Sequence, residues 1–318
     1  MIPTVKRIHA TVLMLILTWI ACTITQASER PGNPELERIP PEVMAPAQDE
    51  NAPGRLLRVT MGGVARSSME NMDAAYTLGC SSVELGLGPV SGSLKLLDFS
   101  WDRPGKYLID TKGRDPWGTL YELSVGANHG GLISERMSYA LLLGATSSHE
   151  REPDDSFSFN GGGYGMYAMN PKWTIAAGAL YSKHQTVETD FEIIPVLSVS
   201  FNTKAASGPS FTIGLPTTEL TWNFSQTTSL TLDTQGFESG IYRLADNSPV
   251  REKGYVEFSG TTCALHIETL VADRINLSAG ISQALSRKHK LYDHKGKNEI
   301  KYDVENPPGC FISLSMPF

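Results

Sequence analysis

The chain has 318 residues and a formal net charge of −7, which argues against nucleic acid as a partner because nucleic-acid-binding domains carry basic patches. Only four cysteines occur, Cys22, Cys80, Cys263 and Cys310, too few and too scattered for a disulfide framework. After residue 27 no segment approaches the about 18 consecutive apolar residues of a transmembrane helix, which excludes a helical membrane protein.

The N-terminus has the pattern of an export signal. A basic pair at 6–7 precedes a short apolar run at 11–21, and an A-x-A-like site ends at Ala27. This order predicts a signal peptide over residues 1–27, cleaved after Ala27. Cys22 leaves a lipoprotein alternative open, although Trp19 occupies the position where a lipobox requires Leu.

Residues 28–55 form the next unit, which is rich in proline and acidic side chains. Such a composition cannot bury a hydrophobic core, so we expect an extended or disordered periplasmic leader. The prolines are Pro31, Pro34, Pro40, Pro41, Pro46 and Pro53.

From residue 56 onward, alternating apolar and polar residues recur between polar turns, the pattern of β-strands with one apolar face. Within the second run the apolar phase changes after Cys80, which predicts a β-bulge. The predicted strands lie near 56–65, 76–87, 94–101, 121–127, 137–145, 157–169, 173–181, 193–202, 211–215, 220–224, 230–244, 255–270, 275–281 and 310–318.

The last strand places Cys310, Ile312, Leu314, Met316 and Phe318 on one face. Its length matches the roughly 9–11 residues that a tilted strand needs to cross a bilayer. A terminal Phe after such a run resembles the C-terminal signal of bacterial outer-membrane barrels, which the barrel-assembly machinery reads. The last strand of a secreted β-sandwich is the alternative.

Connection lengths alternate along the chain, as in barrels with short periplasmic turns and long outer loops. The sequence therefore predicts an all-β fold: a transmembrane antiparallel up-and-down β-barrel of about 12–14 strands over 56–318, in the outer membrane. The count falls to 12 if the hairpin at 209–225 or the first pair does not span. Short connections lie at 88–92, 134–135, 170–172, 225–229 and 272–274, and long ones at 102–118, 147–156, 184–192, 246–254 and 287–308. Two connections break the alternation: 216–218 is short for an outer loop, and 202–209 is long for a periplasmic turn.

The sequence also resembles a family of uncharacterised outer-membrane β-barrel proteins. The resemblance rests on Ile194-Pro195-Val196-Leu197, the segment 208–216, Tyr242-Arg243-Leu244 and the segment 287–293, and extends over roughly 55–318. It implies a barrel in the outer membrane and no particular activity.

Polar residues opposite the apolar set are expected to point into the barrel. They could form a mildly acidic pore lining that favours cations, or a salt-bridge network that fills a narrow interior. The candidate lumen-lining residues are Glu84, Lys95, Asp98, Glu122, Arg136, Glu219, Asp233, Glu257, His266, Glu268 and Asn276.

No nucleotide, zinc or nucleophile-elbow motif occurs, so we predict neither enzyme activity nor a cofactor or metal. The remaining enzymatic alternative is a lipid hydrolase at the barrel rim, where outer-membrane phospholipases carry a Ser/His pair. Ser147 with His149, and Ser182 with His184, have the required spacing.

The segment before the last strand is basic, although the chain as a whole is acidic. We expect an outer loop whose Arg287, Lys288 and Lys290 contact lipopolysaccharide phosphates. A solvated loop that balances nearby acids is the alternative.

The leading function is a pore or transport-like barrel for small polar solutes, with outer-membrane lipids as its surroundings. The alternatives are a closed structural or adhesive barrel that acts through its outer loops, and the rim hydrolase.

Overall fold

A computed structural model describes residues 55–69, 73–106, 111–189, 192–203, 206–272 and 274–318. The predicted signal peptide and nearly all of the predicted leader lie outside these residues. Among the described residues, no helix is both long enough and apolar enough to cross a membrane.

The described residues form fifteen strands and one short 3-10 helix, Pro104–Lys106. The strands are β1 Arg55–Ser68, β2 Ala75–Leu87, β3 Val90–Asp102, β4 Thr119–Ser134, β5 Met137–His149, β6 Phe157–Asn170, β7 Trp173–His184, β8 Ile193–Asn202, β9 Gly208–Leu215, β10 Thr217–Asn223, β11 Thr228–Arg243, β12 Tyr255–Ala272, β13 Ile275–Tyr292, β14 Ile300–Asp303 and β15 Pro308–Pro317.

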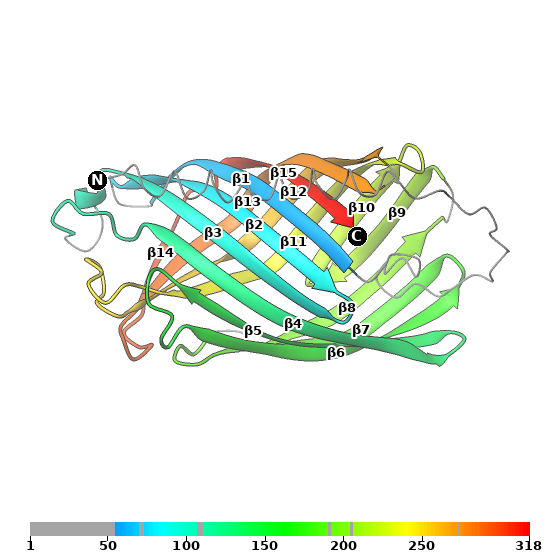
Figure 1. Cartoon of the computed structure of the whole chain (residues 1–318), viewed down its shortest axis with the longest axis horizontal. Helices are drawn as coiled ribbons and strands as arrows, with labels where there is room; N and C mark the ends of the chain where they lie inside the picture. Colours follow the sequence, from blue (N-terminus) through cyan, green and yellow to red (C-terminus); the bar gives the residue numbers. More distant parts are fainter. Residues whose placement is uncertain (1–54, 70–72, 107–110, 190–191, 204–205, 273) are drawn as a thin grey trace. The chain divides into compact units, whose positions relative to one another are not determined.

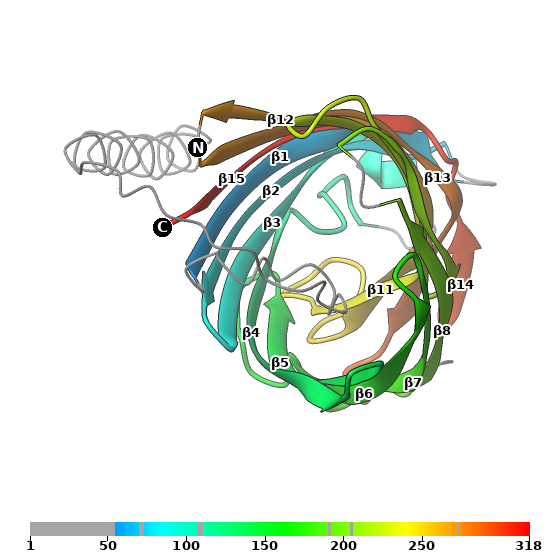
Figure 2. The same cartoon turned by 90° about the vertical axis from the view of Figure 1, so that its right-hand side faces the viewer.

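These strands close into a barrel (Figures 1 and 2). Each strand from β1 to β13 pairs antiparallel with the next, β13 pairs with β15, and β15 pairs with β1. The ring therefore has 14 strands, and β14 adds to the outer part of β13. The predicted fold, an antiparallel up-and-down β-barrel, is confirmed, including the hairpin at 209–225.

Contacts between distant strands identify the inward face. Tyr242 on β11 donates a hydrogen bond of 2.7 Å to Glu122 on β4, and Tyr76 on β2 contacts His289 on β13. Such pairs can meet only across the interior of a closed ring, and the register then assigns the faces of their neighbours. At mid-barrel the opposite face is apolar and exposed, as at Leu143 with 70% of its surface accessible. Where neighbouring strands are paired, this wall satisfies its backbone internally, and its apolar belt suits a bilayer.

Leu314 on β15 tests the assignment of the faces. It lies between Val59 of β1 and Leu277 of β13 on the apolar outward face, whereas Ser313 pairs with Thr60 on the inward face. Leu314→Arg should lower the free energy of unfolding in lipid by about 2–4 kcal/mol, the cost of a charge at the bilayer midplane. Ser313→Arg, measured in the same denaturant titration, should cost much less. Equal losses would contradict the assignment of the faces.

The predicted β-bulge in the second strand is wrong. β2 pairs with β3 from Ala75 to Leu87 without a shift of register. Instead, the apolar face changes sides: Val83 and Leu85 face outward, whereas Tyr76 and Leu78 face inward and pack in a core at the outer end.

That core, here called the cap core, fills the outer end of the barrel. It forms because the outer ends of β5 and β11 meet in one parallel bridge, His149 to Arg243, beyond the ends of β6–β10. In Figure 2 the β11–β12 connection lies within the outline of the ring. The cap core consists of Met69, Ala74, Tyr76, Leu97, Phe99, Trp117, Leu120, Tyr242, Leu244, Val250, Val256, Leu291, Tyr302 and Val304.

Candidate functional site

The lumen below the cap core is lined by small polar side chains. Alternation along each strand places serines, threonines and glycines inward, and hydroxyl pairs bridge neighbouring strands at 2.9–3.0 Å. These pairs are Thr60–Ser313, Ser124–Thr146, Ser200–Thr212 and Thr221–Thr231. Short hydroxylated side chains leave room in the lumen and can replace water as hydrogen-bond partners of a polar solute.

The register places most of the candidate lumen-lining residues on the inward face. There Glu84 pairs with Arg58 at 3.4 Å, an arginine that the sequence analysis did not single out. The inward candidates are Glu84, Lys95, Glu122, Glu219, Asp233, His266, Glu268 and Asn276.

Three candidates lie elsewhere. Asp98 faces outward opposite Gly79 and accepts a hydrogen bond from Thr119. Glu257 is also on the outward side of the wall, opposite Lys290. Arg136 lies in the turn between β4 and β5, outside the strands. For these three residues the lumen-lining prediction is corrected.

A group of carboxylates surrounds His266 on the inward face of β10–β12. The Nδ1 atom of His266 lies 3.3 Å from Asp233 Oδ2, and its Nε2 atom lies 3.6 Å from Glu268 Oε1. Glu219 is opposite Asp233 on β10, and these residues line a cavity of about 280 Å³. Within the described residues no cluster of three His, Cys, Asp or Glu side chains has a geometry suited to hold a metal ion.

The outer end of the lumen is closed by packed aromatic rings. Trp117, from the β3–β4 connection, is 1% exposed, and its ring lies edge-on to Trp101 at 5.0 Å. Phe99 stacks on Phe258 at 5.5 Å, and Phe258 contacts His289 at 4.6 Å. Rings this closely packed exclude water from between them.

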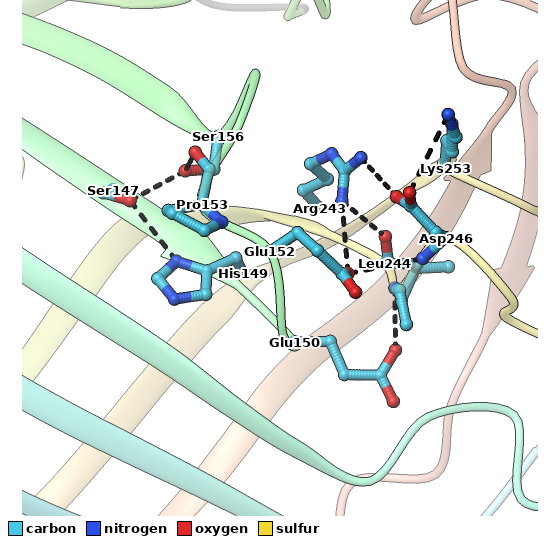
Figure 3. Close-up of polar contacts among 11 residues, drawn as sticks. Ser147, His149, Glu150, Glu152, Pro153, Ser156, Arg243, Leu244, Asp246 and Lys253 are labelled. Carbon is cyan, nitrogen blue, oxygen red and sulfur yellow. Dashed lines mark hydrogen bonds and ion pairs between the residues drawn. The ribbon is translucent and has the colours of Figure 1, made fainter.

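Polar contacts fasten the connections above the cap core (Figure 3). The Glu150 carboxylate accepts hydrogen bonds from the backbone of Gly118 and of Ala245, which joins three connections. The buried Arg243 guanidinium lies 2.6 Å from Asp246 and 3.5 Å from Glu152. Its hydrogen bond holds the pKa of the Asp246 carboxyl below the usual range.

The Ser147 and His149 pair is not arranged as a nucleophile and base (Figure 3). Ser147 Oγ lies 3.3 Å from His149 Nδ1 but only 2.7 Å from Ser156 Oγ. Because Ser156 donates its own proton to the Pro153 carbonyl, it accepts the shorter bond from Ser147. The Ser147 proton is thus directed away from the imidazole, and Ser147 is only 8% exposed.

In the second pair, one nitrogen of the imidazole is bonded to the backbone. Nδ1 of His184 accepts hydrogen bonds from the backbone of Thr186 and Val187, both at 3.1 Å. That nitrogen therefore shapes the β7–β8 connection and does not serve as a base for Ser182.

The basic segment is only partly a loop, because β13 continues to Tyr292. Arg287 lies 3.4 Å from the Ser67 hydroxyl, and Lys290 is buried beside Glu257. The expected loop is corrected at these positions, and of the three only Lys288 is exposed on the outer surface. Contact between Lys288 and lipopolysaccharide phosphate stays a prediction, as does recognition of Phe318 by the assembly machinery.

No protein-family model matches the chain, and no curated protein matches it. Solved structures with some likeness include the NanC porin, at 9% identity and a TM-score of 0.37 over 82% of this chain and 100% of that one. An outer membrane channel from Pseudomonas putida F1 has 7% identity and a TM-score of 0.42 over 89% and 100%. The Ralstonia pickettii toluene transporter TbuX has 10% identity and a TM-score of 0.37 over 83% and 90%. At these scores the likenesses imply nothing about solute or activity.

The fold and the site together define a class. The chain is a closed 14-stranded barrel with an apolar outward belt, a hydroxyl-lined lumen and an aromatic core at its outer end.

Proposed function

We propose that this protein is an outer-membrane barrel that conducts small polar solutes and prefers cations. The observation behind this proposal is the inward face, which is lined by hydroxyl and carboxylate side chains. The interior of a barrel with only a structural role could be filled by apolar packing instead. Bacterial barrels with polar interiors reside in the outer membrane, which supports that location.

The balance of charge in the lumen supports a preference for cations. The Arg58 guanidinium neutralises Glu84, and Tyr242 hydrogen-bonds Glu122. Asp233 and Glu268 lie beside the His266 imidazole, and Glu219 adds a third carboxylate opposite Asp233. A cation that passes them gains favourable Coulomb energy, and an anion is repelled.

Removal of these three charges should reduce ion selectivity. The variant Glu219→Gln/Asp233→Asn/Glu268→Gln keeps size and hydrogen bonding, so the barrel should still fold. We expect its potassium-to-chloride permeability ratio to fall at least about threefold, equivalent to about 0.7 kcal/mol of ion–carboxylate interaction. The measurement is the reversal potential in a planar bilayer under a salt gradient.

Asp98→Asn is the matched control, because Asp98 carries a carboxylate on the outward face. Its permeability ratio should equal that of the unaltered protein. If the triple variant conducts with an unchanged ratio, the carboxylates do not face the conducting path.

The cap core favours one alternative, a closed barrel that acts through its outer loops. The same recordings discriminate between the two, since a closed barrel gives no conductance steps although it folds and inserts.

A further inference from the structure

The lumen has no straight exit at its outer end. The cap core fills the interior there, and Glu150 ties the overlying connections together. A solute that enters from the opposite end therefore needs another way out.

The wall itself separates between β10 and β11. Pairing of these strands ends where Thr217 meets Gln235, and the β11 register then shifts before Glu238. Among the described residues, 238–242 of β11 pair with β12 alone. On the other side, 193–196 of β8 pair with β7 alone, because pairing with β9 starts at Leu197. The short β9–β10 hairpin thus leaves a split in the wall above its tip.

The cavity beside His266 reaches this split. Its walls include Asp233 and Glu219 from the inward face of β11 and β10. They also include Thr217, the last residue of β10 that pairs with β11. The cavity therefore extends along the inward face as far as the end of the pairing between β10 and β11.

A strap, residues 185–189 after β7, bridges the split. Val187 is 2% exposed and packs with Ile241 and Tyr255 on the outward side of β11 and β12. His184, at the base of the strap, lies edge-on to Tyr255 at 5.2 Å. These contacts join the outer end of β7 to β11 and β12. The tip of the β9–β10 hairpin lies beneath the strap.

We propose that solutes pass between the lumen and the outside through this split, over the β9–β10 tip and beneath the strap, and not along the barrel axis. The proposal rests on the proposed pore function. The threonines and carboxylates at the split suit small hydroxylated or cationic solutes, because they offer hydrogen-bond acceptors and negative charge.

The test places a single thiol at the split. In a background with Cys22, Cys80, Cys263 and Cys310 changed to Ser, Thr217→Cys is modified with a maleimide that carries a polyethylene glycol chain. Asn247→Cys, exposed on the β11–β12 connection above the cap core, is the matched control. Conductance is recorded before and after modification, once heat-modifiability on gels shows that each barrel is folded.

Modification of Thr217→Cys should lower conductance at least about twofold, as expected for a bulky group in a conducting path, and modification of Asn247→Cys should leave it unchanged. Glu219→Cys, one step deeper in the same cavity, replaces Thr217→Cys if that variant does not fold. A conducting pore that is insensitive at Thr217 and Glu219, or is blocked at Asn247, overturns the split as the route. Absence of conductance from the unmodified protein overturns the pore itself, and the route with it.

Discussion

Replacement of Trp117 with alanine will lower the free energy of unfolding by about 3–5 kcal/mol, the usual cost of truncating a buried Trp. The side chain is 1% exposed and contacts Phe99, Trp101 and Phe258 within the cap core. Its removal leaves a cavity bounded by rigid strands, which can collapse only slightly. The measurement is denaturant unfolding of the refolded barrel in lipid, followed by tryptophan fluorescence.

Trp222→Ala is the matched control for this prediction. Trp222 is 53% exposed on the outward face of β10, so its truncation opens no cavity and should cost clearly less. A loss at Trp117 no larger than that at Trp222 would show that the outer end is not a packed core.

The barrel could be predicted because the sequence patterns that specify it can be read from short segments of the chain. Alternation with a period of two and the segregation of short and long connections both follow from strands that cross a bilayer repeatedly. The hairpin around Pro216 could be predicted from alternation alone, because its outer connection at 216–218 is short for such a barrel and the connection at 202–209 is long for a periplasmic turn.

The cap core could not be predicted from the sequence, because the pattern that marks it has a second explanation. In β2 the apolar residues change sides after Cys80, which is also what a β-bulge would produce. The cause is a change of surroundings along one regular strand. At the level of the bilayer lipid covers the outward face, whereas beyond it only the interior offers apolar contacts, so Tyr76 and Leu78 turn inward.

The same change of surroundings explains two misplaced lumen candidates. Asp98 and Glu257 do alternate with apolar residues, but their neighbours Phe99 and Phe258 face the cap core, not lipid. Each acid therefore points outward. Trp117 lies in a connection whose sequence shows no alternation of apolar and polar residues. Its burial in the cap core is therefore seen only in the structure.

A buried ion pair lies behind the cap, on the outward side of β12 and β13. Glu257 and Lys290 are paired at 3.5 Å, with side chains only 4% and 5% exposed. The Tyr292 hydroxyl donates a hydrogen bond of 2.6 Å to the same carboxylate. Because both charges have lost their water, each depends on the other far more than a surface pair does.

Lys290→Met should therefore lower the free energy of unfolding by about 3–5 kcal/mol, because it leaves a buried carboxylate without this ammonium. Glu257→Gln added to Lys290→Met should recover most of the loss, since the amide is neutral and still accepts from Tyr292. Lys288→Met, two residues away on the same face but exposed, should change stability by less than about 0.5 kcal/mol. All three are measured by the same unfolding titration. A double variant as unstable as Lys290→Met alone would show that packing of the lysine stem, not its charge, stabilises this side of the cap.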